Sequence, residues 1–398
     1  MDLVGKKIIL GLSGGIACYK AAEFTRALTG AGATVQVVMT QAATHFITSV
    51  TMQALSGQPV YTDQWDARIA NNMPHIDLTR DVDVIVIAPC SADFMAKLAH
   101  GACDDLLSTL CVARPATLPL LVAPAMNVEM WQNPATRRNA ATLVADGIQL
   151  MGPDAGQQAC GETGMGRMLE PAQLLEEVVA SFQPKLMAGK RVLLTAGPTF
   201  EPIDPVRGIT NLSSGKMGYA LARAAREAGA DVTLISGPTA LPAPYGVQRL
   251  NVCSAQQMHD LVMAHVAAQD VFIAVAAVAD WRVANASAQK LKKNADGSAP
   301  ELRFEQNPDI LATVAALPNK PYCVGFAAES ENLLQYGEAK RVKKGIPLLV
   351  GNIGHQTFGR DDNELILFDA HGHAQLPRAS KQHLARQLIG EIARRLPA

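Results

Sequence analysis

The sequence has few charged or aromatic residues, and neither sign of charge dominates it. Of its 398 residues, 18% are charged and 5% are aromatic, and 35 basic side chains balance 36 acidic ones to a formal net charge of −1. Nucleic-acid binders need a broad basic surface, which this balance does not supply. The longest apolar runs are also too short to cross a bilayer. We therefore expect neither a nucleic-acid partner nor a membrane.

Cysteine is scarce and scattered. The seven cysteines are an odd number, and no C-x-x-C pair occurs among them. Their spacing indicates neither a zinc site nor a disulfide framework. The first residues, MDLVGKKIILGLSGG, do not resemble a signal peptide, because their apolar stretch is short and interrupted by glycine. These features predict a cytoplasmic protein with reduced thiols.

The sequence does contain a repeated alternation of short apolar runs and alanine-rich stretches. Residues 6–12 (KKIILGL) and 190–196 (KRVLLTA) each begin with a basic pair, continue as an apolar run and are followed by a helical stretch that ends in A-G-A. Strands that alternate with helices are typical of doubly wound parallel sheets. The pattern predicts two Rossmann-like α/β domains, residues 1–189 and 190–398.

In such sheets, ligands bind at the carboxyl ends of the strands. The first loop of this kind, residues 11–17 (GLSGGIA), lacks the G-x-G-x-x-G spacing of dinucleotide-binding proteins. Its small residues nevertheless open a helix, whose first N–H groups suit a phosphate. The alternative is a tight strand-to-helix turn without a ligand.

Three more features of the first half carry reactive side chains. Asn127 in PAMNVEMW follows an apolar run, and its amide is suited to hold a carboxylate. His75 lies in NMPHID, outside any clear helix, and Cys160 lies in the glycine-rich residues 152–167. A cysteine in a glycine-rich flap can reach a substrate. Taken singly, each residue also has a structural interpretation, such as core packing or a solvated histidine.

Together, the SGG turn, P-x-M-N-x-x-M-W, H-I-D-L and A-C-G-E-T-G-M-G-R resemble the flavin-dependent cysteine decarboxylases. The resemblance covers about residues 5–180 and is closest to the phosphopantothenoylcysteine decarboxylases. It implies FMN as the cofactor, held between the subunits of a trimer. The flavin-contacting positions that it implies are Ser13, Gly14, Thr40, Ser91, Ser108 and Met126.

The same resemblance implies a role for each reactive residue. Oxidation of the substrate's Cβ–S bond by the flavin creates an electron sink for the loss of CO₂, and the reduced flavin then returns the hydride. His75 would assist the oxidative decarboxylation, Asn127 would hold the substrate carboxylate, and Cys160 would protonate the enethiolate carbon. The flap would exclude water from the reactive intermediate.

In the second half, residues 195–218 read TAGPTFEPIDPVRGITNLSSGKMG and end in small residues at an expected helix start. The Gly215-Lys216 pair is not a Walker A motif, because no glycine stands five residues before Gly215 and Met217 replaces the serine or threonine. An anion site of another kind is one interpretation. A helix capped by Ser213 or Ser214, with Lys216 in solvent, is the other.

Further along, polar residues again follow expected strands. Asp280 ends the AVAD segment, where a carboxylate can hold Mg²⁺ or a sugar hydroxyl, or cap a helix. Residues 307–310 (NPDI) indicate a turn and a helix N-cap. Lys340 and Lys344 are spaced to share one helix face. The basic run 290–293 (KLKK) is either a solvated face or a contact for a triphosphate.

In this order, TAGPT, DPVRGITNLSSGKMG, AVADW and KLKK resemble the phosphopantothenate–cysteine ligases, over about residues 190–395. The resemblance implies that CTP, with Mg²⁺, activates the carboxylate of 4′-phosphopantothenate as an acyl-cytidylate, from which cysteine displaces CMP. Asn211 and Arg207 would serve the acyl-cytidylate and Lys290 would steady the triphosphate. The substrate phosphate would be held by Ser213, Ser214 and Gly215. The implied CTP contacts are Ala276, Ala277, Asp280, Lys290, Asn307, Pro308, Asp309, Ile310, Phe326, Lys340 and Lys344, with Asp280 also the candidate Mg²⁺ ligand.

The two resemblances join as the successive halves of the bifunctional coenzyme A biosynthesis proteins. That family forms trimers through the flavin half and dimers through the ligase half, which implies a dodecamer. Phe200 and Leu212 depart from the ligase pattern, since relatives often carry a basic residue at the first and Leu212 is apolar within N-x-S-S-G. The alternatives are a flavin-binding regulatory protein and an enzyme with one inactive half. The presence of His75, Asn127 and Cys160 together disfavours the regulatory protein.

Overall fold

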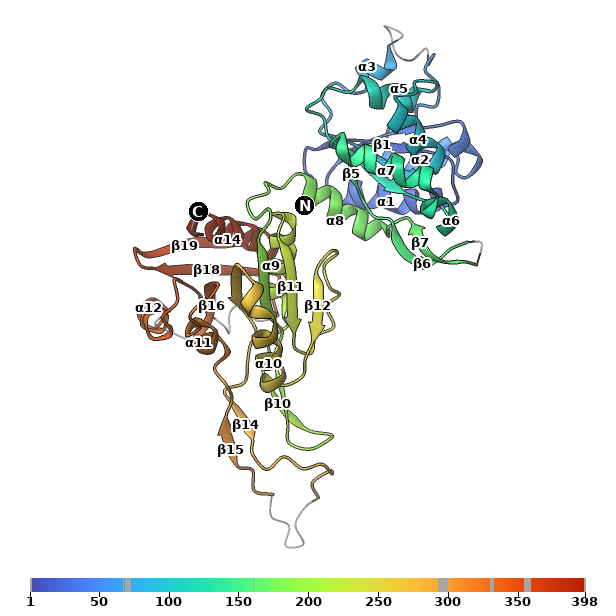
Figure 1. The fold of residues 1–398 in the computed structure, drawn as a ribbon. Coiled ribbons are helices and arrows are strands. Elements are labelled where there is room, and N and C mark those ends of the chain that lie inside the picture. Colours follow the sequence, from blue (N-terminus) through green and yellow to red (C-terminus); the bar gives the residue numbers. More distant parts are fainter. Residues whose placement is uncertain are drawn as a thin grey trace. The chain divides into compact units, whose positions relative to one another are not determined.

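Two separate sheets organise the chain in the computed structural model (Figure 1). The structure describes residues 2–66, 68, 73–159, 161–292, 300–329, 333–353 and 359–396. Each sheet belongs to its own unit, Met1–Phe182 or Gln183–Ala398. The expected domain boundary after residue 189 lies a few residues beyond this division. None of the described helices is both long enough and apolar enough to cross a membrane.

The sheet of the first unit is parallel throughout, in the order β2-β1-β3-β4-β5. Its central strand β3 reads VIVIAPC and is buried at every residue, as expected for a parallel strand covered on both faces. The strands are β1 (Lys7–Leu12), β2 (Thr34–Met39), β3 (Val84–Cys90), β4 (Leu120–Pro124) and β5 (Gln149–Leu150).

Helices connect these strands and cover the sheet. Helix α1 packs on β1, β2 and β3, while α4, α5 and α7 share one apolar core with β3 and β4. The helical segments are α1 (Cys18–Gly30), η1 (Ala42–His45), α2 (Ser49–Ser56), α3 (Pro74–Asp77), α4 (Ala92–His100), α5 (Leu106–Ala113), α6 (Val128–Gln132), α7 (Pro134–Ala145) and α8 (Pro171–Ser181).

The glycine-rich segment of the first unit forms an antiparallel hairpin of β6 (Asp154–Gln157) and β7 (Thr163–Arg167). Its stem lies close against the loop after β4. A Cβ added to Gly166 would lie 2.6 Å from the carbonyl oxygen of Met126, and one on Gly164 would lie 2.6 Å from Val128. Glycine is therefore required for this close approach.

The sheet of the second unit has the order β12-β11-β8-β13-β16-β17-β18-β19. The strands from β12 to β17 are parallel, and β18 and β19 extend the sheet as an antiparallel pair. The strands are β8 (Arg191–Ala196), β11 (Asp231–Ser236), β12 (Gln248–Asn251), β13 (Val271–Ala274), β16 (Tyr322–Glu329), β17 (Leu348–Ile353), β18 (Asp362–Asp369) and β19 (Gly372–Ser380).

This second sheet is covered by helices on both faces. Val192 and Leu194 of β8 pack in one core with residues of α9 and α14, while Leu193 packs in another core with residues of α10 and α11. The predicted fold class, two doubly wound α/β domains, is thereby confirmed. The helical segments are α9 (Lys216–Glu227), α10 (Ala255–His265), η2 (Val266–Ala268), α11 (Ile310–Ala315), α12 (Leu333–Lys344) and α14 (Lys381–Arg395).

Two small antiparallel ribbons complete the second unit. One pairs β9 (Phe200–Pro202) with β10 (Gly208–Thr210), and the other pairs β14 (Trp281–Val283) with β15 (Phe304–Gln306). They follow β8 and β13, so both carry residues of the motifs that sequence analysis singled out.

Candidate active sites

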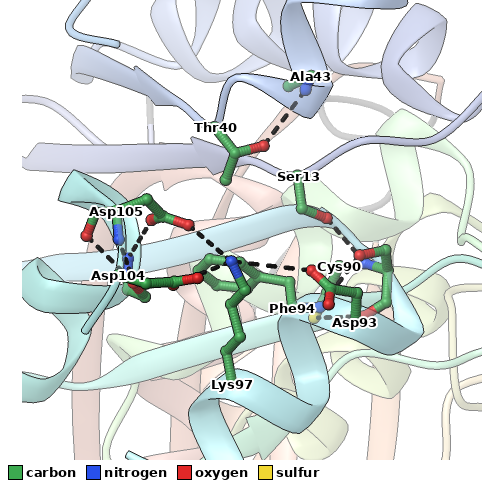
Figure 2. A network of polar contacts seen from close by, with 11 residues as sticks. Ser13, Thr40, Ala43, Cys90, Asp93, Phe94, Lys97, Asp104 and Asp105 are labelled. Atoms are coloured by element: carbon green, nitrogen blue, oxygen red, sulfur yellow. Dashed lines mark hydrogen bonds and ion pairs between the residues drawn. The ribbon is translucent and has the colours of Figure 1, made fainter. Parts of the chain in front are cut away.

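Ser13 ties the carboxyl ends of β1 and β3 together (Figure 2). Its hydroxyl donates to the carbonyl oxygen of Pro89 at 2.9 Å and accepts the N–H of Ser91 at 2.8 Å. Ser91 in turn caps α4, because its hydroxyl accepts the N–H of Phe94 at 3.1 Å. The chain order of the strands reverses between β1 and β3, which is where doubly wound sheets bind ligands.

Beside this junction, the turn that leads into α1 presents unpaired backbone donors. The N–H groups of Gly14, Gly15 and Ile16 donate to no atom in the part of the chain that the structure describes. A Cβ on Gly14 would lie 2.6 Å from the Cβ of Ala42, whereas one on Gly15 would meet nothing within 4 Å. Gly14 thus allows the turn to pack on η1, and the free N–H groups suit an anion such as a phosphate.

A cavity of about 380 Å³ opens at this junction. Four of the predicted site residues line it, namely Gly14, Ser91, Met126 and Asn127. Tyr19, Lys20, Gln158 and Arg167 also line it, and sequence reasoning missed them.

Lys20 is the most informative of the missed residues. Only 4% of it is exposed, and its ammonium donates to the carbonyl oxygen of Met168 and to Glu170 Oε1, both at 2.9 Å. In the sequence it stands among Cys18, Ala21 and Phe24, which are all buried. A lysine within an apolar helix face was the signal that could have found it.

Asn127 has a fixed amide orientation. As the N-cap of α6, its Oδ1 accepts the N–H of Met130 at 3.0 Å, and its Nδ2 donates to Glu162 Oε2 at 3.4 Å. The carbonyl end of the amide is therefore engaged with the helix, and the NH₂ end faces the hairpin and the cavity. Of the two N–H donors of the amide, the one that Glu162 does not accept is left for a carboxylate.

Three predicted flavin contacts are engaged within the protein and lie outside the cavity lining. Ser13 and Thr40 are buried, and the Thr40 hydroxyl accepts the N–H of Ala43 at 3.2 Å. Ser108 is fully buried in a capping box with Asp105 at the start of α5. These side chains shape the strand-end loops in this structure.

Lys97 joins α4 to the start of α5 (Figure 2). Its ammonium lies 2.9 Å from Asp104 Oδ1, 3.2 Å from Asp105 Oδ2 and 3.9 Å from Asp93 Oδ2. Burial alone would lower the pKa of Lys97, but the hydrogen bonds with Asp104 and Asp105 raise it above its ordinary value. The ion cluster therefore fixes the helix start that carries Ser108.

His75 lies in helix α3, a single short turn that begins at Pro74. The expectation that it stands outside any helix is wrong, because proline at the first helical position favours such a turn. His75 does not line the cavity of Asn127, and α3 and the β6–β7 hairpin lie at opposite ends of this unit (Figure 1). Cys160 lies outside the described residues.

In the second unit, two threonines of TAGPT hold the loop after β13. The Thr195 hydroxyl accepts the N–H of Ala276 at 3.3 Å, and the Thr199 hydroxyl accepts that of Ala279 at 3.0 Å. The carbonyl oxygen of Ala277 accepts the Asn211 Nδ2 amide at 2.8 Å. The loop that carries Asn211 is thus joined to the loop that ends in Asp280.

A cavity of about 220 Å³ opens over the carboxyl ends of these strands. Thr195 lines it, and it gathers most of the predicted CTP contacts from four separate segments of the chain. Those contacts are Ala276, Asp280, Asn307, Pro308, Asp309, Ile310, Phe326, Lys340 and Lys344. Ala277 and Lys290 are outside its lining.

Asp309 caps α11, as the NPDI motif predicts, because its Oδ1 accepts the N–H of Ala312 at 3.0 Å. Its other carboxylate oxygen pairs with the ammonium of Lys344. Burial alone would raise the pKa of Asp309, but the hydrogen bonds from Lys344 and Ala312 lower it below its usual value. Asp309 therefore holds Lys344 at the edge of the cavity.

Asp280 presents an exposed carboxylate at the same edge. Asn307 fixes its backbone, because the N–H of Asn307 donates to the carbonyl oxygen of Asp280 at 2.9 Å and its Nδ2 to that of Ala279 at 2.8 Å. Among the described residues, no three acidic, histidine or cysteine side chains form a metal-binding group. Asp280 alone offers a Mg²⁺ ion one carboxylate, and Mg²⁺ held by one or two carboxylates takes its other ligands from water and substrate phosphates.

Gly215, the N-cap residue that precedes helix α9, has a left-handed φ of 77°. The interpretation that Ser213 or Ser214 caps this helix is wrong, since Gly215 is the N-cap and no side chain caps it. The N–H groups of Lys216, Met217 and Gly218 find no acceptor within the described ranges. The Lys216 ammonium pairs with Asp361 at 2.6 Å, so the free donors are those of the backbone.

Arg207 lies in the turn between β9 and β10, with its side chain 49% exposed. Its guanidinium contacts the buried carboxylate of Asp204 and the carbonyl oxygen of Leu291, next to Lys290.

Phe200 packs over Gly208 across this ribbon, because a Cβ on Gly208 would lie 2.3 Å from the Phe200 ring. Leu212 is 89% exposed.

Family models match both units. The model described as "Flavoprotein" matches residues 1–183, and that described as "DNA/pantothenate metabolism flavoprotein C-terminal domain" matches residues 187–396. The coenzyme A biosynthesis bifunctional protein CoaBC of Vibrio cholerae is 50% identical over 392 residues, 98% of each chain. That of Escherichia coli strain K12 is 46% identical over 401 residues, 99% of this chain and 98% of the relative. A solved structure, the FMN binding protein AtHal3, is 36% identical and covers 44% of this chain and 96% of that chain, with a TM-score of 0.40.

Proposed function

Since the chain belongs to the coenzyme A biosynthesis bifunctional proteins, which unite a cysteine ligase with a flavin-dependent decarboxylase, we propose that its two units catalyse consecutive steps. The unit Gln183–Ala398 couples 4′-phosphopantothenate to L-cysteine at the expense of CTP. The unit Met1–Phe182 decarboxylates the product, 4′-phosphopantothenoylcysteine, to 4′-phosphopantetheine.

The observation that carries this proposal is the ligase cavity and the free donors near it. Lys340 and Lys344 bring two cations to a small cavity at the strand ends, which suits the triphosphate of CTP. The unpaired N–H groups at the start of α9 suit the phosphate of 4′-phosphopantothenate. Asn211 donates to the loop that leads to this cavity. This position supports a role for its amide in binding the acyl-cytidylate.

Charge neutralisation and positioning are the tasks of the remaining ligase residues. Lys290 steadies the triphosphate during activation of the carboxylate, and Arg207 assists the conversion of the acyl-cytidylate. When bound with CTP, Mg²⁺ supplies further positive charge to the triphosphate, with Asp280 as the candidate protein ligand. Cysteine's amine then displaces CMP, forming the amide bond as the carboxyl–phosphate bond breaks.

The cavity of the first unit fits FMN. The free N–H groups of Gly14, Gly15 and Ile16 suit its phosphate, and the cavity walls of Ser91 and Met126 suit its ring. When bound, FMN supplies a two-electron acceptor and donor for the substrate. Asn127 orients the substrate carboxylate by its N–H donors, and the β6–β7 hairpin covers the cavity against water.

The decarboxylase site also needs a second copy of the chain. His75 lies outside the cavity that Asn127 lines within its own chain, which supports a base supplied by a neighbouring subunit. We place it there through a trimer of the first units, and with dimers of the second units the closed assembly is a dodecamer. We assign the enzyme to the cytoplasm, where the free cysteines of the described residues remain reduced.

Mass spectrometry of a complete reaction tests the proposed function. The protein loaded with FMN is incubated with 4′-phosphopantothenate, L-cysteine, Mg²⁺ and CTP, with a CTP-free control. We expect 4′-phosphopantetheine only when CTP is present. A reaction that ends at 4′-phosphopantothenoylcysteine would contradict the decarboxylase role, and the absence of any product would favour a flavin-binding regulatory protein.

Replacing Cys160 by serine tests the proton donor. The thiol is the acid assigned to the last protonation, and serine is a far weaker acid, so Cys160→Ser is expected to lose CO₂ normally and to stall before reduction. The product should be lighter than 4′-phosphopantetheine by two hydrogens in a mass spectrum. Cys103→Ser, at an exposed thiol of the same unit, is the control. Formation of 4′-phosphopantetheine at the normal rate would remove the role of Cys160.

A further inference from the structure

We propose that Asp204 is a positioning residue of the ligase site, which holds Arg207 and the Lys290 loop in one fixed arrangement. The proposal rests on the function proposed above for Arg207 and Lys290. Asp204 itself does not line the CTP cavity. Its effect on the reaction therefore passes through the two residues that it holds.

The first oxygen of the Asp204 carboxylate builds the turn between β9 and β10. Oδ1 accepts the N–H groups of Val206 at 2.9 Å and Arg207 at 2.8 Å. This local pattern is common for aspartate in turns and needs only one carboxylate oxygen. An asparagine would satisfy it equally well.

The second oxygen reaches beyond the turn. Oδ2 accepts Nε of Arg207 at 3.0 Å and also contacts its Nη2. The same Oδ2 accepts the N–H of Leu291 at 3.1 Å, although Leu291 lies 87 residues further along the chain. Turn formation does not require these contacts, so they demand another explanation.

Leu291 is held from both sides. Its N–H donates to Asp204, and its carbonyl oxygen accepts Nη2 of Arg207 at 2.9 Å. A further contact joins the N–H of Ser287 to the carbonyl oxygen of Ile203 at 2.9 Å. Because both peptide groups of Leu291 are fixed, the backbone of its neighbour Lys290 is fixed relative to Arg207.

Charge explains why a carboxylate serves here. Asp204 is 2% exposed, and a buried anion is tolerated only when it is paired and fully hydrogen-bonded. The hydrogen bond from Arg207 is the main cause that holds the pKa of the Asp204 carboxyl well below its usual range, with further contributions from the backbone N–H groups. The ionised carboxylate thus attracts the guanidinium and accepts a backbone donor at once.

A double-mutant cycle on the full-length enzyme tests the proposal. Asp204→Asn keeps the Oδ1 contacts but turns an NH₂ group toward the Arg207 guanidinium and the Leu291 N–H. We expect it to slow CTP-dependent pyrophosphate release about 10- to 100-fold, as for a small displacement of a reacting group. When Asp204→Asn is introduced into the Lys290→Gln variant, it should slow pyrophosphate release by no more than about a further threefold, because the two residues act as one unit.

Glu227→Gln is the matched control. Glu227 is also a buried carboxylate that accepts arginine donors, Arg223 Nε at 2.9 Å and Arg386 Nε at 2.6 Å, but it lies at the carboxyl end of α9, away from the cavity. It should lower the melting temperature while leaving pyrophosphate release at saturating substrates unchanged. If Asp204→Asn does not fold, Asp204→Glu, which keeps the charge but moves the oxygens, replaces it with the same expected cycle.

The possible outcomes separate this proposal from the proposed function. Normal pyrophosphate release in the Asp204 variant, or full additivity with Lys290→Gln, overturns the positioning role while the wild-type activity still supports the ligase. A comparable loss of pyrophosphate release in Glu227→Gln, at a similarly lowered melting temperature, also overturns it. If the wild-type protein releases no pyrophosphate from CTP, both proposals fail.

Discussion

Asn211→Asp should release pyrophosphate from CTP and then accumulate the acyl-cytidylate. Asn211 donates from Nδ2 to the carbonyl oxygen of Ala277 at 2.8 Å, whereas an ionised aspartate has no proton to donate there. Its carboxylate would repel that carbonyl and the phosphodiester of the intermediate. Losing one such donor costs about 10²- to 10³-fold in rate, so amide formation should fall by this factor.

Rapid-quench mass spectrometry measures this effect directly. A burst of pyrophosphate, with the acyl-cytidylate present and little 4′-phosphopantothenoylcysteine, is the expected pattern. Asn285→Asp is the control, because Asn285 also donates from Nδ2 to a carbonyl oxygen, that of Glu301 at 2.9 Å, but is exposed and outside the cavity. An Asn211→Asp enzyme that forms product at the normal rate would contradict the assignment.

Asn127→Asp should slow decarboxylation strongly without affecting the ligase. The new carboxylate can still cap α6, since it accepts the N–H of Met130 as Asn127 Oδ1 does at 3.0 Å. It loses both N–H donors, however, and it places a negative charge beside Glu162 and the substrate carboxylate. We expect 4′-phosphopantothenoylcysteine to accumulate and its conversion to fall by about 10²-fold or more.

The same mass-spectrometric assay measures this change, with the flavin absorbance recorded to show that FMN is retained. Asn133→Asp is a closely matched control, because Asn133 also caps a helix, accepting the N–H of Ala135 at 2.9 Å, and lies outside the cavity lining. It should decarboxylate normally. Equal rates for Asn127→Asp and Asn133→Asp would show that the amide donors of Asn127 are not needed.

The sequence predicts the fold well, because local signals determine it. Apolar runs such as VIVIAPC in β3 cannot alternate between core and solvent, so they indicate parallel strands covered on both faces. The NPDI motif caps α11 as expected, and the spacing of Lys340 and Lys344 brings both to one cavity. These features depend on neighbours in the chain.

Residues that depend on distant partners are harder to predict. In the sequence, Asp204 resembles an ordinary turn residue, and only its hydrogen bond with the N–H of Leu291 indicates a second role. Lys20 is found only when the apolar face of α1 is known to be buried. Ser108 shows the reverse case, since a side chain expected at the flavin is buried in a capping box. For Asp204 and Lys20 a tertiary contact decides the role, whereas the capping box of Ser108 with Asp105 is a local contact.

The backbone donors in the turn before α1 and at the start of α9 make part of each candidate site insensitive to substitution. A peptide N–H group does not depend on the side chain of its residue. An exposed residue such as Leu212, 89% exposed, can therefore be replaced without removing these donors. The constraint falls instead on residues whose bulk would move the main chain, such as Gly14 against Ala42. Side chains that stand over these backbone donors can therefore change, whereas the close packing behind the donors cannot.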